Sequence, residues 1–473
     1  MSWEKLRGDA REIWQAGVDA VSPMRLLRRV MQLTPGGVSI CGREYPWSEW
    51  ERVIVVGAGK AGGGMAAAVE EILGEEIVGE RVVGWVNVPE DCVRPLKKIH
   101  LHGARPAGVN EPTVEGVQGT ERILELVRSA GERDLCLVLI SGGGSALLPM
   151  PVEGVSLRAK QEVTRMLMQR GATIGELNCV RKELSQVKGG GLARASCAGR
   201  MVSLILSDVI GDPLEVIASG PTVTNSSTGG MALEVLRRFQ SSDLASTAHR
   251  AVAPAKEGEL GVDDFPREVV EYLKRKEGEG GVREFPGERV ENHVIGNNAT
   301  ALEAAGEEAR RRGYEVRTLG SDRGGKAEEE GRDFARRCWA IQGELKRGGG
   351  PVCLLSGGEP TVTLRPTEKP RKGGRNQQLI LSALDELWDE GVEGMAILSG
   401  GTDGEDGPTD AAGGFLDQGV WQGARRSERS LKEDLEIQNA YAYLEGVGGL
   451  LVTGPTHTNV MDLRVGVVES RRE

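Results

Sequence analysis

Short runs of apolar, often β-branched residues recur along the chain, and each ends in a glycine-rich turn that is followed by a helical pattern. These runs occupy residues 52–56, 135–140, 201–206, 352–355 and 395–398. A strand that is buried on both faces has a continuous apolar sequence, and strands that are joined through helices become parallel. The pattern therefore predicts an α/β fold with largely parallel sheets, in which functional loops follow the carboxyl ends of the strands.

The stretch from about residue 255 to 291 differs from the rest because it is charged and rich in glycine, as in K-R-K-E-G-E-G-G at 274–281. Such a composition is typical of a linker or an insertion. Beyond it, 292–296 has a strand pattern and 299–312 has a helical one. A chain of 473 residues also exceeds the roughly 250–300 residues that one hydrophobic core can serve. We therefore predict an N-terminal domain over 1–288 and a C-terminal α/β domain over 289–473.

Composition and charge narrow the possible partners and locations. The net charge of −11 argues against nucleic acid or an acidic membrane surface as a partner. The seven cysteines show no C-x-x-C spacing and are expected to be reduced, and no stretch of about 20 apolar residues could span a membrane. The first residues carry acids and lack the apolar segment of a secretion signal, so we expect a cytoplasmic protein. The helical pattern at 10–33 contains arginines but also acids, so we interpret it as a packing helix and not as a mitochondrial presequence.

The first candidate site is the turn G-A-G-K-A-G-G at 57–63, which follows a predicted strand and precedes a helical pattern. Gly57 and Gly59 belong to a G-x-G-x-x-G pattern, whose glycines let the backbone approach a phosphate at a helix N-terminus. Lys60 inside this turn could neutralise a phosphate whose charge changes during a reaction. The pattern alone is weak, and a tight turn with a solvated lysine is the alternative interpretation.

A second glycine-rich turn, S-G-G-G-S-A-L at 141–147, follows another predicted strand. Its successive backbone N–H groups, flanked by two serine hydroxyls, could wrap around an anion. The residues predicted to bind phosphate groups are Ser141, Gly142, Gly143, Gly144 and Ser145. A simple bend after a strand is the alternative. A serine nucleophile is disfavoured, because the segment lacks a G-x-S-x-G elbow and histidine is scarce.

Two further segments carry charged side chains after a helical or a strand pattern. The helical pattern at 178–192 contains Lys182 and Lys188, which six residues of separation would place on different faces of one helix, so one of the two is expected to meet a ligand. Asp208 follows a predicted strand, and Asp212 lies four residues further on. A carboxylate at the tip of a buried strand suits a general base or a Mg²⁺ ligand. For both aspartates, a turn or a helix cap is the alternative.

Taken together, these motifs resemble the class II glycerate 2-kinases. The matching segments in the first half are G-x-G-K-A at 57–61, S-G-G-G-S-A-L at 141–147, N-x-x-R-K at 178–182, S-D-V-x-G-D at 207–212 and A-S-G-P-T at 218–222. In the second half they are L-S-G-G-E-P-T-V at 355–362, G-G-R-N-Q at 373–377 and G-T-D-G-x-D-G-P-T-D-A at 401–411, which look like the MOFRL domain of that family. The resemblance covers about residues 10 to 465, with the motifs in unchanged order.

The resemblance implies two α/β/α domains, the first of them Rossmann-like, with the active site in the cleft between them. It also implies ATP and Mg²⁺ as cofactors, and D-glycerate as the substrate that becomes 2-phosphoglycerate. A monomer or a homodimer is expected. The catalytic residues of the family fall on Lys60, Asp208 and Arg375 of this chain.

Several further residues complete the expected site. Besides the two glycine turns, Lys182 and Asn376 are predicted to contact the nucleotide. The predicted metal ligands are Asp208, Asp212 and Asp403. The acids at 403, 406 and 410 lack EF-hand spacing, so a metal site and a structural turn are alternatives for them. Arg375 offers a planar fork that suits either a carboxylate or a γ-phosphate.

One segment departs from the pattern of the family. The sequence T-H-T-N-V at 456–460 stands where relatives carry T-G-T-N-V. Glycine adopts backbone conformations that side chains disfavour, so His457 affects the geometry of that loop and any ligand contact that it makes.

Two other functions are compatible with parts of the pattern. An NAD(P)-dependent hydroxypyruvate reductase would use the same glycine turn, but apart from His457 none of the five histidines lies in these motifs to supply the acid that such a hydride transfer usually needs. A non-catalytic phosphosugar-binding regulator would use similar serine and glycine loops, but it would have no use for Lys60, Asp208 and Arg375. Consumption of ATP with glycerate discriminates the three functions.

Overall fold

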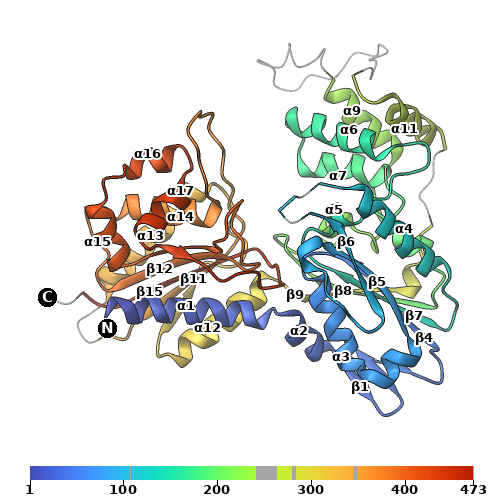
Figure 1. Ribbon diagram of the computed structural model, residues 1–473, viewed down its shortest axis with the longest axis horizontal. Coiled ribbons are helices and arrows are strands. Elements are labelled where there is room, and N and C mark those ends of the chain that lie inside the picture. Colours follow the sequence, from blue (N-terminus) through green and yellow to red (C-terminus); the bar gives the residue numbers. More distant parts are fainter. Residues whose placement is uncertain (107, 110, 241–263, 280–283, 346–348, 472–473) are drawn as a thin grey trace. The chain divides into compact units, whose positions relative to one another are not determined.

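The computed structural model describes residues 1–473 except 107, 110, 241–263, 280–283, 346–348 and 472–473 (Figure 1). The described residues form two compact units, and both are discontinuous in sequence. The N-terminal unit comprises residues 30–205 and 213–293. The C-terminal unit comprises residues 1–29, 206–212 and 294–473.

A six-stranded sheet with the order β6-β5-β4-β7-β8-β9 forms the centre of the N-terminal unit. Its strands are β4 (Arg52–Ala58), β5 (Val82–Pro89), β6 (Ile99–Arg105), β7 (Asp134–Ile140), β8 (Arg200–Leu206) and β9 (Val290–Gly296). The pairs β4–β5, β5–β6, β4–β7 and β7–β8 are all parallel, as the apolar runs predict. Every residue of β7 is buried, which is typical of a strand that helices cover on both faces.

Helices surround this sheet and extend it at one end. The helices α3 (Gly62–Arg81) and α4 (Val114–Arg128) follow β4 and β6. A separate group with its own apolar core consists of α6 (Leu157–Gln169), α7 (Ile174–Glu183), α9 (Gly229–Arg238) and α11 (Arg267–Glu279) (Figure 1). The smaller elements are η1 (Glu90–Cys92), α5 (Gly144–Leu147), α8 (Gly191–Ala195), η2 (Ile217–Ser219), η4 (Gly287–Arg289) and the antiparallel strands β1 (Met31–Thr34), β2 (Gly37–Ile40) and β3 (Arg43–Pro46).

The C-terminal unit contains a second six-stranded sheet, with the order β10-β11-β15-β12-β13-β14. Its strands are β10 (Glu315–Thr318), β11 (Val352–Gly358), β12 (Met395–Gly401), β13 (Gly413–Leu416), β14 (Leu450–Leu451) and β15 (Asp462–Val468). Within this sheet, β10–β11 is the one parallel pair among the described strands. Strand β15 inserts antiparallel between β11 and β12, and the pairs β12–β13 and β13–β14 are antiparallel as well. The α/β class is therefore confirmed, but this sheet is mixed and not largely parallel.

Two layers of helices cover the C-terminal sheet. The helices α1 (Trp3–Ala20) and α12 (Asn298–Arg311) pack against one face of β11, β12 and β15, and α13 (Ala327–Glu344) and α14 (Arg375–Glu386) pack against the other. The remaining helices are α2 (Pro23–Val30), α15 (Gln418–Arg426), α16 (Leu431–Glu436) and α17 (Ala440–Gly446). Figure 1 shows the resulting three layers within this unit.

The compact units differ from the continuous domains predicted over 1–288 and 289–473. Residues 1–29 group with the C-terminal unit, because α1 buries Leu6, Ile13 and Trp14 against its sheet and α12. A helical pattern shows which face of a helix is apolar, but not which distant sheet that face covers. The pattern at 10–33 is also not one helix, since Pro23 begins α2 after a break at Ser22.

The charged stretch expected as a linker or insertion is partly helical. Residues 267–279 form α11, which packs against α6 and α9. Its buried side chains are Val269, Val270, Tyr272 and Leu273. The residues at 241–263 and 280–283 lie outside the described part of the chain. The charged residues K-R-K-E at 274–277 thus lie on the solvent side of α11, which is an amphipathic helix.

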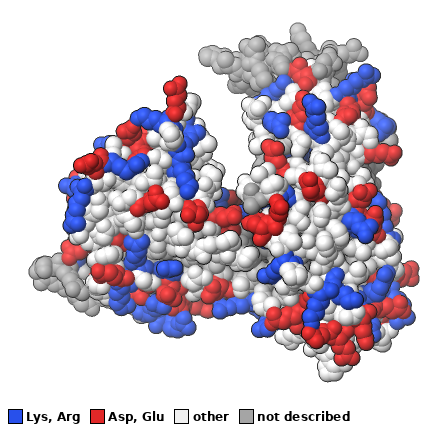
Figure 2. Space-filling view, viewed as in Figure 1, with Lys and Arg blue, Asp and Glu red and all other residues white. Residues whose placement is uncertain are grey.

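The surface carries both signs of charge. On the face drawn in Figure 2, Lys and Arg alternate with Asp and Glu over the described residues of each unit. All seven cysteines are free thiols. Within the described ranges, no helix has the length and apolar character needed to cross a membrane.

Replacing Gly57 with alanine is expected to lower the free energy of unfolding by about 1–3 kcal/mol, the usual range for an overpacked core. A Cβ atom at Gly57 in β4 would lie 2.0 Å from the carbonyl oxygen of Leu139 in β7, so two paired backbones would have to separate. Urea unfolding of the two proteins measures the difference.

Gly79 provides the control for this substitution. It lies on the exposed side of α3, and a Cβ there would have no atom within 4 Å. Gly79→Ala is therefore expected to stabilise the protein by about 0.5–1 kcal/mol. Equal effects of the two substitutions would contradict the proposed packing of β4 against β7.

Candidate active site

The two predicted glycine turns interlock at the carboxyl ends of β4 and β7. The backbone N–H of Lys60 donates to the carbonyl oxygen of Gly142 at 2.9 Å, and the N–H of Ala61 donates to Ser141 Oγ at 3.0 Å. A Cβ at Gly59 would lie 2.0 Å from Ser141 Oγ. The first turn therefore needs glycine to approach the second, and the structure brings the turns that carry Lys60 and Ser141 together.

Two basic residues, Arg105 and Lys60, lie beside Gly143 in the second turn. Its φ of +77° lies in the left-handed region, which glycine adopts without strain. A Cβ built there would lie 3.3 Å from Arg105 Nη2 and 3.8 Å from Lys60 Cγ. Arg105 ends β6 and is only 4% exposed. This arginine was not predicted. The signal that could have indicated it is its position at the carboxyl end of a strand, since functional residues were expected at such ends.

Ser145 is the centre of a hydrogen-bonded cluster. Its Oγ accepts from Arg181 Nη2 at 2.5 Å and from Lys188 Nζ at 2.6 Å, and it lies 3.0 Å from Ser219 Oγ. Since an oxygen that accepts two hydrogen bonds has only its own proton left to give, Ser145 is the donor toward Ser219. The hydroxyl is thus held in one orientation.

The lysines of the third motif do not share one helix. The helix α7 ends at Glu183, and Lys188 lies in the turn that follows, where its Nζ also donates to the carbonyl oxygen of Ser145 at 2.6 Å. Of the two, Lys188 contacts the second glycine turn. Lys182 is half-buried on α7; burial lowers the pKa of its ammonium group, and Glu215 opposes that shift.

Ser219 lies in a strained segment. Ala218, Ser219 and Gly220 have φ values of +50°, +63° and +61°, and only the glycine adopts such angles without cost. Residues in this region cost of order 1–3 kcal/mol each and persist where the surrounding structure fixes them. Here the strain places Ser219 Oγ against Ser145 Oγ.

The C-terminal unit holds the predicted aspartates after β8. Asp212 has a φ of +52°, and its Oδ2 accepts a hydrogen bond from Asn297 Nδ2 at 2.5 Å. Asn297 is also the N-cap of α12, because its Oδ1 accepts from the N–H of Thr300 at 3.0 Å. Asp208 lies two residues beyond the end of β8, in a turn that the bond from Ser207 N to the carbonyl of Gly296 fastens to β9.

Arg375 begins α14 and is held by two carboxylates. Its Nε and Nη2 donate to the two oxygens of Asp462 at 2.7 and 3.0 Å, and its Nη1 donates to Glu359 at 2.7 Å. Burial by itself would lower the pKa of Arg375, but the charge and hydrogen bonds of Asp462 and the charge of Glu359 together outweigh burial and raise the pKa. The guanidinium is therefore a fixed cation that keeps two of its five N–H groups beyond these three bonds.

A buried network fixes the start of α14. Asp406 accepts from the backbone N–H groups of Asn376 and Gln377 at 3.0 and 2.8 Å, and Asn376 accepts from Ser399 Oγ at 2.6 Å. Burial raises the pKa of Asp406 to about 7, against the opposite effect of these N–H donors. Asn376 is fully buried and so ties β12 and the following loop to the helix that carries Arg375.

The loop at 456–460 keeps the conformation that glycine favours. His457 has a φ of +60°, a region in which histidine is more frequent than most side chains. Next to it, the hydroxyl of Thr456 donates to the carbonyl of Thr402 at 2.5 Å, and the backbone N–H of Thr456 donates to the carbonyl of Asp403 at 3.1 Å. The histidine thus leaves the loop attached to the turn that contains Asp403.

Comparisons with known proteins identify the family of this chain. A family model described as "Domain of unknown function (DUF4147)" matches residues 9–253, and one described as "MOFRL family" matches residues 352–462. Glycerate kinase of Homo sapiens is 36% identical, over 97% of this chain and 92% of that protein. D-glycerate 2-kinase of Thermotoga maritima is 35% identical, over 98% of this chain and 99% of that protein. The chain belongs to the class II glycerate kinase family.

A solved structure shares the fold of this class II glycerate kinase family member. The crystal structure of glycerate kinase from Thermotoga maritima superposes with a TM-score of 0.79, at 35% identity, over 98% of this chain and 100% of that one. The resemblance drawn from the motifs is therefore confirmed. The residue roles and the location of the active site between two domains stay predictions.

The carboxylates of this family member do not form a protein metal cage within the described residues. No three of its described His, Cys, Asp and Glu side chains gather so that they could hold a metal ion. One oxygen of Asp212 is bonded to Asn297, and Asp403 Oδ1 accepts from the N–H of Glu405 at 3.0 Å. Mg²⁺ that travels with a nucleotide needs only one or two carboxylates, so the predicted ligands Asp208, Asp212 and Asp403 stay a prediction.

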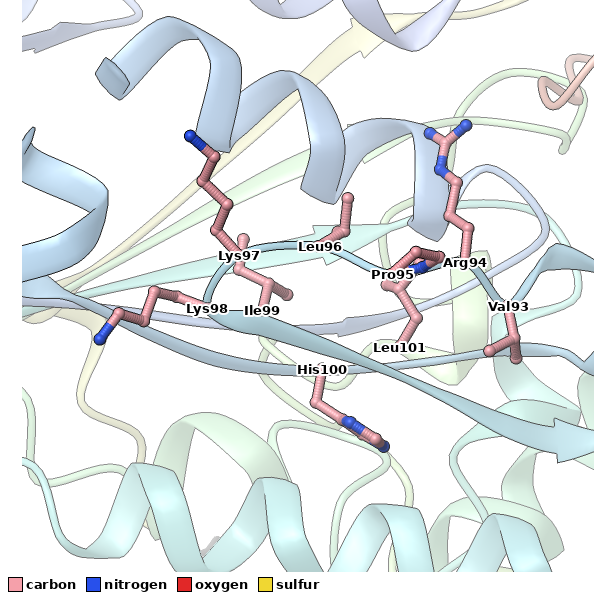
Figure 3. Close-up of a pocket in the computed structure, with 9 residues that line it drawn as sticks. All are labelled: Val93, Arg94, Pro95, Leu96, Lys97, Lys98, Ile99, His100 and Leu101. Carbon is pink, nitrogen blue, oxygen red and sulfur yellow. The ribbon is translucent and has the colours of Figure 1, made fainter. Parts of the chain in front are cut away.

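A cavity of about 330 Å³ lies elsewhere in the N-terminal unit, along the segment Val93–Leu101 (Figure 3). Figure 3 shows Arg94 and Lys97 on the side of a helix, whereas His100 points the opposite way. Glu70 of α3 shapes the segment by accepting the backbone N–H groups of Lys97, Lys98 and Ile99 at 2.7–2.8 Å. None of the residues predicted for the glycerate kinase reaction lines this cavity.

Replacing Arg375 with lysine is expected to lower kcat/KM for glycerate and ATP by about 10-fold to 100-fold. An ammonium group cannot form the bidentate pair with Asp462, so the charge would move from its fixed position, and small displacements at a reacting centre have effects of about this size. Steady-state kinetics with each substrate varied measures the loss.

Arg336 is a matched control for this substitution, because it forms a bidentate pair with Glu386 at 2.7 and 3.0 Å on the surface of the same unit. Arg336→Lys is expected to leave the kinetics unchanged. If Arg375→Lys did the same, Arg375 would only support the fold.

Proposed function

We propose that this chain transfers the γ-phosphoryl group of ATP to the 2-hydroxyl of D-glycerate and so forms 2-phosphoglycerate. The observation that carries the proposal is the interlocked pair of glycine turns, with Lys60 in one and Ser141 in the other. The names of the relatives support the substrate, since they include a D-glycerate 2-kinase at 35% identity over nearly the whole chain.

Phosphoryl transfer requires little covalent chemistry from protein groups. It needs the phosphates held in place, the developing charge on the transferred group balanced, and the attacking hydroxyl aligned. In the proposed reaction the two glycine turns hold the phosphates through backbone N–H groups. Lys60 balances negative charge on the phosphoryl oxygens, an interaction that strengthens in the transition state.

Asp208 is proposed to orient the glycerate 2-hydroxyl and to accept its proton. The pKa of an alcohol is too high for an early proton loss, so the carboxylate acts mainly by positioning until the new P–O bond forms. Arg375 supplies a fixed positive charge for an anion of the substrate pair. Its two carboxylate partners hold it still, which is the property that a positioning cation needs.

Mg²⁺ is proposed to enter with the nucleotide. When bound, the ion would reduce the negative charge of the phosphate groups, and Asp208, Asp212 and Asp403 are the proposed residues that would hold it. The carboxylate oxygens of these residues are the ligand type that this ion prefers.

A coupled assay tests the proposal. ADP release on addition of D-glycerate is followed with pyruvate kinase and lactate dehydrogenase, and a separate reaction with enolase reports 2-phosphoglycerate but not the 3-phosphate. We expect ATP-dependent formation of the enolase substrate. NADPH-dependent or NADH-dependent reduction of hydroxypyruvate without ATP consumption would instead favour the reductase, and phosphosugar binding without turnover would favour a regulator.

A further inference from the structure

Three basic side chains gather around Ser145 inside the N-terminal unit. Arg181 and Lys188 donate to Ser145 at 2.5 and 2.6 Å. Lys160 of the neighbouring helix α6 lies near them, since the charge of Arg181 acts on Lys160 and the charge of Lys160 acts on Lys188. Lys160 is 4% exposed and Lys188 is 2% exposed, whereas Arg181 is only partly buried. The cluster is thus buried, with one edge toward solvent.

Within the described part of the chain, no carboxylate is among the hydrogen-bond partners of these three side chains. The acceptors are a serine hydroxyl, a backbone carbonyl and the amide oxygen of Asn178, and Lys160 Nζ is buried without a hydrogen-bond partner in the described structure. Glu183, two residues from Arg181, accepts from Asn225 at 2.8 Å and from Ser227 at 3.2 Å. Unpaired buried charges are unfavourable, so the arrangement needs an explanation outside the stability of the fold.

The pKa values of the two buried lysines also favour the binding of an anion by this cluster. Burial and the charge of Arg181 lower the pKa of Lys160 to about 7. Burial, followed by the charges of Arg181 and Lys160, lowers the pKa of Lys188 well below its ordinary value. Without an anion, Lys160 is therefore partly neutral near pH 7, and Lys188 loses its proton more readily than an exposed lysine does. An anion that enters would restore their charge and draw protons from the solution.

We propose that Lys160, Arg181 and Lys188, together with Ser145, form a pocket for a phosphoryl group of the substrate pair. The proposal rests on the kinase function and deepens it, because it names the group that this part of the site binds. Three cations exceed what one carboxylate would balance, whereas a phosphate carries up to two charges and several strong acceptor oxygens. The pocket adjoins the turn at 141–147, which interlocks with the loop of Lys60.

Inorganic phosphate is the probe for the whole protein. We expect phosphate to raise the Tm of the parent and to bind with proton uptake, which calorimetry at pH 8 in buffers of different ionisation enthalpy measures. Lys160→Met keeps the length of the side chain and removes the buried charge. This variant should have a higher Tm without phosphate than the parent, and its phosphate affinity should be at least about tenfold lower.

Arg158 supplies the control, since it is an exposed cation two residues away on the same helix. Arg158→Met should keep the phosphate affinity and the proton uptake of the parent. Arg181→Gln is the second variant, because its partly exposed position tolerates replacement, and it should also weaken phosphate binding. Unchanged phosphate affinity in Lys160→Met and Arg181→Gln would overturn the proposal.

Competition identifies the source of the phosphoryl group. Displacement of phosphate by ADP or ATP places a nucleotide phosphate in the pocket, and displacement by 2-phosphoglycerate places the phosphate of the product there. Displacement by D-glycerate alone would show a carboxylate site and overturn the proposal.

The proposed function is tested separately by glycerate turnover. If the parent phosphorylates glycerate but the variants bind phosphate normally, the proposed pocket is wrong and the proposed function stands. If phosphate binding depends on Lys160 but the protein does not phosphorylate glycerate, the proposed pocket stands and the proposed function is wrong.

Discussion

Replacing Lys60 with alanine is expected to lower kcat by about 100-fold or more while the protein stays folded. The side chain extends from a turn whose backbone is fixed by bonds to Gly142 and Ser141, so its loss leaves the two glycine turns in place. A contact to the oxygens of the transferred phosphoryl group is stronger in the transition state than in the ground state. Removing this contact therefore lowers mainly kcat. The coupled ADP assay at saturating glycerate and ATP measures the change, and circular dichroism verifies the fold.

The control for this substitution is Lys274→Ala. Lys274 is exposed on α11 in the same unit, far in sequence from both glycine turns, and its removal changes the net charge by the same amount. We expect parental kcat from this variant. A folded Lys60→Ala enzyme that also turned over normally would remove Lys60 from the mechanism and leave it as a lysine in a tight turn.

Replacing Asp208 with asparagine is expected to lower kcat by about 10²–10⁴-fold, the usual contribution of a general base. Asparagine keeps the shape and some hydrogen bonding of the side chain but loses its charge and its ability to accept the hydroxyl proton. The KM for ATP should change little if the residue acts on the glycerate hydroxyl. Measuring kcat over a Mg²⁺ titration for the parent and the variant provides the test.

The titration separates the two roles that a carboxylate in this position can have. A base gives a low kcat at every Mg²⁺ concentration, whereas a metal ligand gives a weaker apparent Mg²⁺ affinity and a rate that recovers at high Mg²⁺. Asp389→Asn, on an exposed position in the same unit, is the control and should match the parent. An unchanged rate for Asp208→Asn at all metal concentrations would exclude both roles.

The strands and turns of the site could be predicted because their sequence signals are local. Each apolar run of the N-terminal sheet became a buried strand, and both glycine turns follow such strands at the same edge of the sheet. Parallel pairing of β4 with β7 then brings Lys60 beside Ser141, which the order of the motifs alone does not reveal.

The cations around Ser145 were harder to predict, because each comes from a different element. Lys188 could be singled out, but it was expected on the helix that carries Lys182 and instead lies in the turn after α7. Lys160 lies inside the amphipathic pattern of α6, where a lysine ordinarily belongs to the solvent face. Nothing in a single sequence distinguishes a buried lysine from an exposed one in such a pattern.

The partners of Arg375 illustrate the same limit over a longer distance. Asp462 starts the last strand of the sheet, 87 positions away, and no spacing rule connects the two residues. The antiparallel insertion of β15 between β11 and β12 places this carboxylate at the N-terminus of α14. An apolar run predicts a strand, but not the neighbours or the direction that it takes in the sheet.

The central position of β15 has a consequence for how the protein is made on the ribosome. The helix α1 leaves the ribosome early, yet the surface that it covers includes β15, which is synthesised hundreds of residues later. At roughly 5–20 residues per second, α1 waits for tens of seconds with Leu6, Ile13 and Trp14 uncovered. The N-terminal sheet strands β4 to β7 are complete long before that, so we expect the N-terminal unit to acquire structure during synthesis. We expect the C-terminal unit, by contrast, to become resistant to protease only after β15 has been synthesised, and until then α1 is a segment that chaperones can bind.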